Sequence, residues 1–512
     1  MIISLSVLVI TIIVSGTYAL YKAQLSKNIG VNTTTHGLAY YINYVKGTDI
    51  TAATLNPSTS YEGGASSDIE FWKKDDSYDI YGKIELTVNT IGTNLSNSPA
   101  LKYAVVNNGN VLKEGSLKGT TSGSKVTILK NLYLEQTKQI YTVYVWLDNS
   151  EELGNISNES LSISVDCTAS LQKEPTAADT IISLYTSAAK VTATNNSITY
   201  NTAPSVSLMN DRLGGTTTDL DGGNIRYYGA NPNNYIYFNC SDYSNQTSST
   251  CETWRIIGVF NGKLKLIRGS QIGTYSWDNK NTSTGEESNS GKNDWTTARL
   301  MKLLNPVDYY INDNNDKDSE GNYLGYSLYY NSTSGKCYSG QNNATVDCDF
   351  TSTGIKNDET RNMIAETTYN LGGWNTFTVY PNEIYEYERG TTVYTGRLPT
   401  WTGKIALAYP SDYGYAADLN QCKDKTLYYY DNSTCTSNNW MKAILGTSSH
   451  GWLLTPYSGH SYYAWHVRSG GNVYSYLAYG AYGAVPVLSL SSELGIESGG
   501  DGSSSNPYKL SA

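Results

Sequence analysis

Six of the seven cysteines fall into three closely spaced pairs, and this spacing restricts the fold more than any other feature of the sequence. Each pair flanks a polar loop, and the pairs are Cys240/Cys251, Cys337/Cys348 and Cys422/Cys435. Zinc binding is disfavoured, because no pair has the C-x2-C spacing and no histidine lies nearby. A disulfide that closes a loop of this length stabilises the folded state by about 3 kcal/mol. We therefore predict three local disulfides in an oxidising compartment, with Cys167 as the unpaired thiol, while other pairings among the six stay open.

An uncharged apolar run, residues 2–19, opens the chain. Its length suits a bilayer-spanning helix or the apolar core of a signal peptide, and Thr17-Tyr18-Ala19 supplies a small-residue cleavage site. Lys22 and Lys27 follow the run and no basic residue precedes it, which by the positive-inside rule would keep the rest of the chain inside the cell. The disulfide prediction opposes that orientation. We expect residues 1–21 to be a signal or membrane anchor, and the protein to be extracellular, anchored at the cell surface or secreted.

Composition excludes two classes of function. The chain has 36 basic and 46 acidic side chains, so its net charge is 36 − 46 = −10, and it lacks the basic surface that nucleic-acid binding requires. Four histidines do not support a histidine-rich metal centre. The acidic loop from Asp316 to Gly321 begins like a calcium loop, but Ser327 stands where such a loop needs a glutamate. We predict no metal and no cofactor.

Tyrosine is unusually common, with 46 tyrosines against 5 phenylalanines. A tyrosine ring is apolar and its hydroxyl is polar, which suits exposed strands and contact surfaces better than a dry core. Glycine, asparagine, serine and threonine are also abundant, and long helical periodicities are few. These features indicate a mainly β, surface-type protein.

Residues 22–172 have the pattern of an antiparallel β-sandwich. Apolar residues alternate with a period of two over 84–88, 102–106 and 141–147, and turn-forming residues separate these strands. A hydrophobic leader that ends in Gly16-Thr17-Tyr18-Ala19, followed by one such sandwich, resembles the camelysin and matrix-fibre family of Gram-positive bacteria. That family includes fibre subunits and proposed proteases, but no metal-ligand spacing here supports proteolysis. We expect a sandwich stalk, followed by a linker over 173–205 that includes a short helix at 178–188.

Residues 206–494 are predicted to form the second domain, and 495–512 a polar tail. The strands are expected at 225–228, 235–239, 253–260, 263–268 and 485–490. One helix is predicted over 295–304, capped by Asp294 and stopped by Asn305-Pro306. A second is predicted from 358 to 370, ending at Gly372-Gly373.

Three motifs in this domain carry a resemblance. They are Glu252–Gly258 (ETWRIIG), Asn293–Ala298 (NDWTTA) and Gly451–Pro456 (GWLLTP). Together with two short helices, local disulfides and a closing apolar strand, they resemble the branch of the C-type lectin fold shared by formylglycine-generating enzymes and the variable proteins of diversity-generating retroelements. The chain departs from that pattern at Val485, where such domains often have arginine before the proline. The resemblance implies an α+β ligand-binding domain. Adenine-directed mutagenesis of asparagine codons would produce Tyr, His, Ser, Asp and Asn, and residues 457–482 contain four of these types, namely Tyr, His, Ser and Asn.

The same stretch, 457–482, holds the candidate binding site. We predict a hairpin with the three-residue loop Ser469–Gly471, because this register separates a polar-aromatic face from an apolar one. The register opposes Arg468 with Asn472, His466 with Tyr474 and Ala464 with Tyr476. It assigns Trp465, Val467 and Val473 to the core. Displayed tyrosines supply contact area at low entropic cost, so we predict the ligand-binding residues to be Tyr457, His460, Tyr462, Tyr463, His466, Arg468, Asn472, Tyr474, Tyr476, Tyr479 and Tyr482.

The favoured function is therefore an adhesin-like surface protein that is not an enzyme and binds a protein or glycan ligand on another cell, phage or host surface. A structural fibre or matrix subunit, in which tyrosines pack between copies, is the first alternative. A surface hydrolase is the second, because Glu386 and Glu388 would share one strand face and paired carboxylates hydrolyse glycosides. An oxidase similar to formylglycine-generating enzymes would need reactive cysteines in a cleft, whereas the pairs here look structural.

Overall fold

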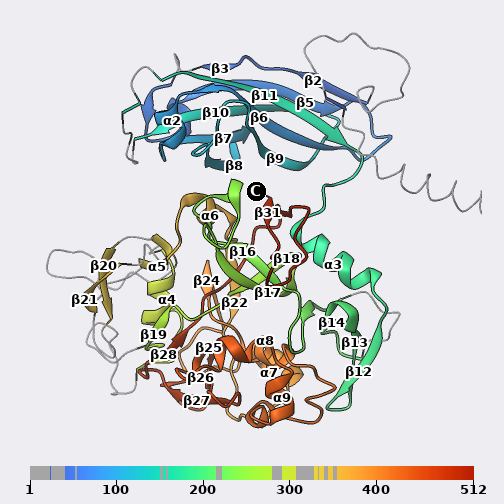
Figure 1. Cartoon of the computed structure of the whole chain (residues 1–512), viewed down its shortest axis with the longest axis vertical. Coiled ribbons are helices and arrows are strands. Elements are labelled where there is room, and N and C mark those ends of the chain that lie inside the picture. The colour runs from blue at the N-terminus through green and yellow to red at the C-terminus, as the bar shows by residue number, and fades with distance from the viewer. Residues whose placement is uncertain are drawn as a thin grey trace, which may run out of the picture. The chain divides into compact units, whose positions relative to one another are not determined.

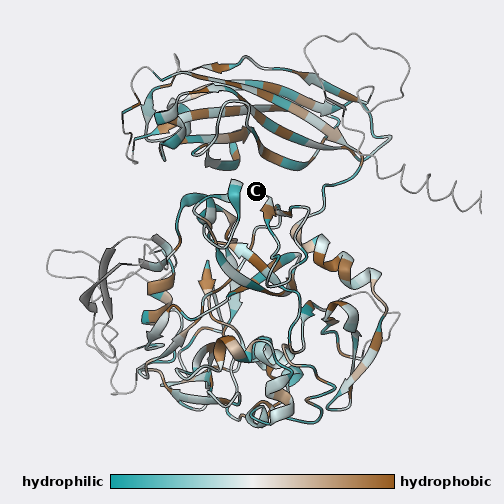
Figure 2. Cartoon of the chain, in the orientation of Figure 1, coloured by the Kyte–Doolittle hydropathy of each residue, from teal (hydrophilic) through white to brown (hydrophobic). Residues whose placement is uncertain are grey.

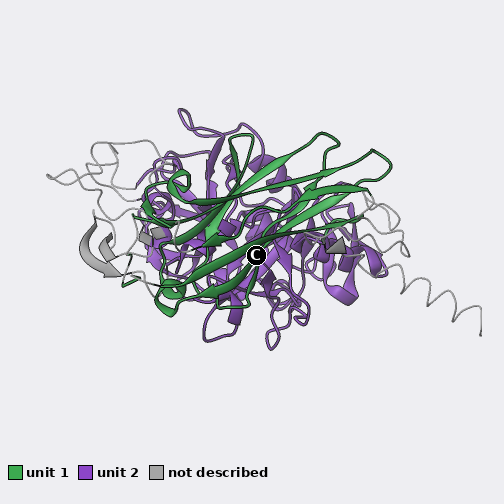
Figure 3. Cartoon of the chain, turned by 90° about the horizontal axis from the view of Figure 1, so that it is seen from above, with its two compact units in different colours: residues 1–174 green, residues 175–512 purple. Residues whose placement is uncertain are grey.

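The chain divides into two compact units, residues 1–174 and residues 175–512 (Figure 3). The computed structural model describes residues 23–24, 41–51, 55–149, 153, 155–156, 159–214, 222–278, 291–306, 309, 328–331, 334–338, 344–349 and 354–511. The predicted leader and the acidic loop at Asp316 lie outside these residues. Within them, no helix is both long enough and apolar enough to cross a membrane.

The first unit is a sandwich of two mainly antiparallel sheets (Figure 1). One sheet has the order β1 (Ala23–Gln24), β11 (Leu161–Ser170), β6 (Tyr81–Ile91), β9 (Lys125–Tyr133), and β3 (Ile50–Thr51) also pairs with β11. The other has the order β2 (Ile42–Val45), β5 (Ala65–Lys73), β10 (Ile140–Asp148), β7 (Leu101–Asn107), β8 (Asn110–Ser116), and β4 (Pro57–Ser58) also pairs with β10. The short helices are η3 (Tyr61–Gly63) and α2 (Thr93–Asn97).

Alternation along the strands explains this sandwich. In β6, buried Ile84, Leu86 and Val88 alternate with partly exposed neighbours, and hydrophobic and hydrophilic residues alternate visibly along the strands of this unit (Figure 2). The side chains that point inward from both sheets form one core. The strands predicted at 84–88, 102–106 and 141–147 are confirmed as parts of β6, β7 and β10. Cys167 is a free thiol buried in this core, as expected.

The second unit contains two large sheets. The first is nine-stranded and runs β12 (Val191–Asn195), β13 (Ile198–Ala203), β14 (Leu208–Asn210), β15 (Ile225–Tyr227), β17 (Glu252–Phe260), β18 (Lys263–Arg268), β29 (Val487–Ser489), β24 (Ile405–Ala406), with β16 (Tyr235–Phe238) also paired to β17. The second is five-stranded and runs β19 (Gly273–Tyr275), β28 (Tyr482–Ala484), β25 (Gly451–Pro456), β26 (Tyr463–Val467), β27 (Val473–Leu477). The five predicted strands of this domain are confirmed in the first sheet.

Smaller elements complete this unit. Three two-stranded pairs are β20 (Ser334–Tyr338) with β21 (Ala344–Asp349), β22 (Thr367–Asn370) with β23 (Thr400–Gly403), and β30 (Gly495–Ile496) with β31 (Leu510–Ser511). The helices are α3 (Ala177–Ser187), η4 (Pro204–Val206), η5 (Tyr243–Asn245), α4 (Arg299–Leu304), α5 (Leu328–Asn331), α6 (Asp358–Met363), α7 (Pro381–Glu388), α8 (Pro410–Tyr415), η8 (Leu427–Tyr429), α9 (Ser433–Ser437) and α10 (Lys442–Leu445).

The segments interpreted as a linker and a polar tail are folded parts of the second unit. The helix predicted at 178–188 exists as α3, but it buries Ile181 and Tyr185 in the core, and β12 and β13 follow it into the nine-stranded sheet. In the tail, Tyr508 and Leu510 are buried in the same core. Both segments are rich in polar residues, and each buries a few apolar side chains at intervals that composition does not reveal.

Two predicted helices are shorter than expected. The helix predicted to start after Asp294 begins only at Arg299, because Asp294 accepts a hydrogen bond from the Thr296 amide in a turn instead. It ends before Asn305, as predicted. The helix predicted over 358–370 ends at Met363, and β22 follows it. The β-branched and aromatic residues of β22 favour a strand when a partner such as β23 is present.

Two of the three predicted disulfides are confirmed. Cys240 is bonded to Cys251, and Cys422 to Cys435. The side chains of Cys337 and Cys348 lie outside the described part of the structure, although their backbones belong to the paired strands β20 and β21. Structural disulfides persist in oxidising compartments, so these two pairs indicate an extracellular type of environment.

Candidate ligand-binding site

The tyrosine-rich segment forms the predicted hairpin in the predicted register. Strands β26 and β27 pair His466 with Tyr474 and Ala464 with Tyr476, and the Arg468 amide donates to the Asn472 carbonyl at 2.9 Å. Gly471 closes the three-residue loop at a φ of +102°, a backbone conformation that favours glycine. The predicted core residues Trp465, Val467 and Val473 are fully buried.

Two of the eleven predicted contact residues are not displayed. His466 is 1% exposed and Asn472 is 8% exposed. The prediction considered the hairpin as an isolated ribbon, whereas β26 is an interior strand with β25 on its other side, and Trp452 of β25 is the partner of His466. The rings of Tyr482 and Trp452 lie 4.8 Å and 5.9 Å from the His466 ring and cover it.

Burial also changes the chemistry of His466. Burial, together with the nearby charges of His450 and Arg468, lowers the pKa of His466 to about 3. Its Nδ1 atom is buried and has no hydrogen-bond partner among the described residues. His466 is therefore a neutral ring inside an aromatic layer, and a ligand would meet its neighbours first.

Strand β27 is the edge of the five-stranded sheet, so its tyrosines keep part of their surface. Tyr476 is 38% exposed and Tyr474 is half-buried. Arg468 is exposed, and its guanidinium carbon lies 4.2 Å from the centre of the Tyr474 ring. We call the contacting rings around His466 the His466 ring group, whose members are His450, Trp452, His466, Tyr474, Tyr476 and Tyr482.

A second set of rings precedes the hairpin. This His460 ring group consists of Tyr457, His460, Tyr462 and Tyr463. His460 is exposed and stacks on Tyr457 with 5.8 Å between ring centres and 12° between ring planes. Strand alternation places Tyr463 on the Trp465 side of β26, opposite His466. The predicted site is therefore two ring groups and not one uninterrupted face.

Phe377 joins the two groups. Its ring centre lies 5.4 Å from that of Tyr457 and 4.5 Å from that of Tyr474. The remaining predicted residue, Tyr479, is half-buried, and its carbonyl accepts a hydrogen bond from the Ser276 hydroxyl. Nine of the eleven predicted residues thus keep some exposed surface, and of these Arg468 and Tyr479 belong to neither ring group.

Asn293 holds the backbone of the His460 ring group by hydrogen bonds, a role that the sequence did not suggest. Its side-chain amide donates to the carbonyl oxygens of Tyr457, His460 and Tyr463 at 3.0, 2.7 and 2.9 Å. Asn293 is 1% exposed, so water does not compete for these bonds. The only signal in the sequence was the Asn-Asp-Trp motif, which carried the fold resemblance and no stated function.

The hairpin turn contacts Tyr413 and the helix α9, which carries one cysteine of the second disulfide. The Tyr413 hydroxyl donates to the Gly471 carbonyl at 2.6 Å, and a Cβ on Gly471 would lie 2.8 Å from Thr436 Cγ2. Thr436 and the bonded Cys435 are both in α9. The turn is thus in contact with residues far away in sequence, and these contacts restrict its movement.

Four charged side chains form a buried ion network elsewhere in this unit. Arg226 pairs with Asp211 at 2.6 Å and with Asp412 at 3.0 Å, and Lys265 also pairs with Asp412. Burial alone would raise the pKa of Asp412, but the charges of Lys265 and Arg226 outweigh burial and lower it. All four charges are compensated within the described structure, so the network connects β15, β18 and α8 and presents no free reactive group.

The proposed carboxylate pair is wrong, because Glu386 and Glu388 lie on the helix α7 and not on a strand. Glu386 is exposed, whereas Glu388 is fully buried and accepts hydrogen bonds from the Ser411 amide and hydroxyl. Burial raises the pKa of Glu388 to about 7, against the opposing effect of Arg389. The two carboxylates do not face a common substrate, which removes the basis for the hydrolase alternative.

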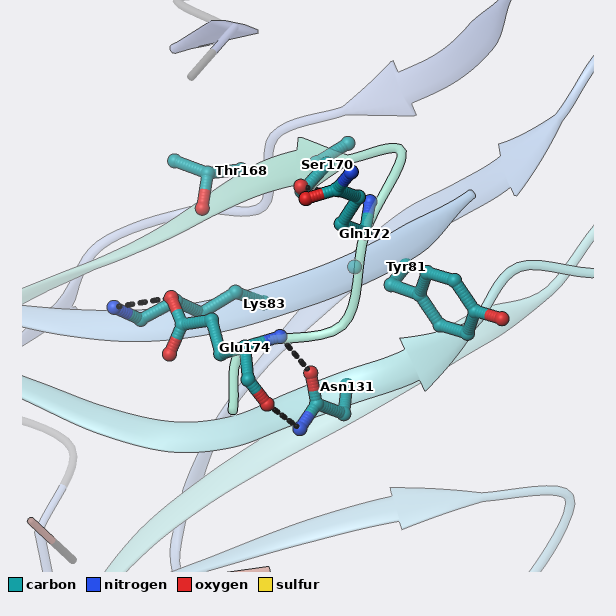
Figure 4. Close-up of a pocket in the computed structure, with 9 residues that line it drawn as sticks. Tyr81, Lys83, Asn131, Thr168, Ser170, Gln172 and Glu174 are labelled. Atoms are coloured by element: carbon teal, nitrogen blue, oxygen red, sulfur yellow. Dashed lines mark hydrogen bonds and ion pairs between the residues drawn. The ribbon is translucent and has the colours of Figure 1, made fainter. Parts of the chain in front are cut away.

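A small pocket in the first unit offers little chemistry. It is lined by residues that include Tyr81, Lys83 and Asn131 (Figure 4). The Asn131 side chain exchanges hydrogen bonds with the Glu174 backbone, and Lys83 pairs with the Glu174 carboxylate at 3.6 Å. These polar groups are therefore paired with one another, and they hold Glu174, at the end of this unit, against β6 and β9.

The chain matches no known protein family, and no curated protein is significantly similar to it. Among the described residues, no three His, Cys, Asp or Glu side chains come together as a metal site would require.

Proposed function

We propose that this protein is an exported, adhesin-like surface protein of a bacterium, in which a sandwich stalk carries a C-type-lectin-like domain that binds a ligand. The observation that carries this proposal is the pair of ring groups. They combine partly exposed tyrosines with a frame fixed by Asn293, Tyr413 and a disulfide. Rigid aromatic side chains lose little entropy when a ligand binds, so a prepared surface of this kind favours recognition.

Two further observations support export and binding without catalysis. Both described disulfides fit an oxidising location. The buried charges of Arg226, Lys265, Asp211 and Asp412 compensate one another, whereas Arg468 and His460 lie exposed beside tyrosines. The membrane anchor and a target on another cell, phage or host surface complete the proposal.

A binding array of glycans and surface proteins tests this function with the full chain and its variants. Tyr476→Ala and Tyr474→Ala should each weaken binding at least about tenfold, the loss expected for a central aromatic contact. Tyr78→Ala is the matched control, because Tyr78 is 46% exposed but belongs to the first unit. The proposal fails if no ligand binds above background, or if all three variants bind like the parent protein.

A further inference from the structure

We propose that the ligand at the His466 ring group is an acidic saccharide, whose carboxylate or sulfate is held by Arg468 and His450 while a sugar ring stacks on Tyr476. This inference rests on the proposed binding function and adds the chemical class of the ligand. Three properties of the site lead to it: a cation without a counter-ion, a free imidazole donor, and a small exposed aromatic surface.

Arg468 is a cation without a partner among the described residues. Its side chain forms no ion pair or hydrogen bond there, and its one described contact is with the Tyr474 ring. Arg226, Arg268 and Arg361 each pair with a carboxylate. The side chain of Arg468, in contrast, is exposed to solvent and accessible to an anion. Its planar fork matches a carboxylate or sulfate group.

His450 adds a hydrogen-bond donor beside this arginine. Its Nδ1 accepts a hydrogen bond from the Ser469 amide at 2.8 Å, so in the neutral ring the proton is on Nε2. No described residue accepts a hydrogen bond from Nε2. Partial burial and the charge of Arg468 lower the pKa of His450, which keeps the ring neutral at pH 7 and Nε2 available as a donor.

No carboxylate balances this positive charge within the described structure. The positive charge of Arg468 acts on both His450 and His466, and it disfavours a further cation beside them. Asp431 approaches the hairpin turn at Gly470 but forms no ion pair with Arg468. The site therefore attracts an anion.

The exposed aromatic surface of this ring group is small and matches a single sugar ring. A stable protein interface covers about 800 Å² on each partner, whereas Tyr476 is the one tyrosine of this ring group classed as exposed, at 38%. Tyr474 and Tyr482 are half-buried at its sides. One exposed ring with flanking hydroxyls can accommodate one sugar ring with its hydroxyls, and the cation beside it selects a sugar that carries a negative charge.

The test is an array that pairs carboxylated and sulfated oligosaccharides with their methyl-esterified and desulfated forms, probed with the full chain. We expect at least one acidic saccharide to bind about tenfold or more tightly than its neutral form, because a charge-assisted hydrogen bond is lost. Arg468→Gln should remove this preference and His450→Asn should reduce it, since asparagine tolerates the positive φ of residue 450. Arg212→Gln, which removes one charge from another exposed arginine of this unit, should leave it unchanged.

The remaining outcomes separate this inference from the proposed function. A neutral glycan or a protein that binds through Tyr476 but is indifferent to Arg468→Gln would overturn the inference and leave the binding function intact. Inorganic sulfate or acetate that competes as well as the acidic saccharide would reduce the site to a plain anion site and would also overturn it. Absence of any ligand would reject both.

Discussion

His466 is paired with Trp452 across the β25–β26 ladder, and this pairing places the imidazole ring inside the second unit. Without β25, the hairpin would present His466 to solvent on its polar-aromatic face. With β25 present, the ring is buried and packs against the rings of Tyr476 and Tyr482. The surface that we propose for recognition is therefore the outer edge of an aromatic layer whose interior is buried.

The burial of His466 predicts a loss of stability in acid. The pKa of His466 is lowered to about 3 in the folded state, and an unfolded histidine titrates near 6.5. Between pH 3 and pH 6.5 the unfolded state binds a proton that the folded state does not bind. The contribution of neutral His466 to the free energy of unfolding is therefore fully present above pH 6.5, and it falls by about 1.4 kcal/mol per pH unit as the pH decreases toward 3. Urea unfolding of the parent and of His466→Phe measures this difference, which should grow in favour of the variant below pH 6.5. A difference that is constant with pH would contradict the burial of a neutral ring, and His460→Gln is the exposed control.

Glu388 predicts the opposite dependence on pH. Its pKa is raised from 4.5 to about 7, so the folded state retains a proton that the unfolded state has already released. Stability from this group is full below pH 4.5 and falls by about 1.4 kcal/mol per unit as pH rises toward 7. Glu388→Gln should therefore become more stable relative to the parent across this range in the same urea measurements. Glu386→Gln, which changes an exposed carboxylate of the same helix, is the matched control.

Asn293 should control the order of the His460 ring group. Asn293→Ala removes three partly buried hydrogen bonds and leaves three carbonyls without this donor, at a cost of about 2–3 kcal/mol in unfolding free energy. Hydrogen exchange should accelerate over residues 457–463 before it changes elsewhere. Asn97→Ala, which loses one exposed hydrogen bond in the first unit, is the control. Unchanged exchange over 457–463 would show that the segment is held by ring packing alone.

The disulfide between Cys422 and Cys435 should stabilise the hairpin turn as well as its own loop. Replacing both cysteines with serine is expected to lower the unfolding free energy by about 3 kcal/mol, because the unfolded chain gains the freedom of a 13-residue loop. Exchange at Gly471 should increase as well, since Thr436 and Tyr413 pack against the turn. Replacing Cys240 and Cys251 in the same way should cost similar stability without affecting Gly471.

Much of the local structure could be predicted, and the errors have a common cause. The hairpin register was predictable because alternation within 463–477 fixes which residues can share a face. The burial of His466 was not, because it depends on β25 and on Tyr482 of β28, which flank the hairpin from outside. The burial of Glu388 was equally unpredictable. The sequence pattern favoured a strand there, whereas Glu388 lies in α7 and is buried because this helix packs against Ser411 of α8.

The sequence by itself determined the alternating strands, the two described disulfides, the free thiol of Cys167 and the pairing of β26 with β27. The strands, the disulfides and the hairpin pairing each depend on residues close to one another along the chain. The free thiol follows because six of the seven cysteines form close pairs and Cys167 is left over. Only the tertiary structure decided that the tyrosine-rich segment splits into two ring groups, that His466 and Asn472 are covered, and that Asn293 holds the first group. Burial depends on which distant elements pack against a residue, and a local pattern contains no information about those neighbours.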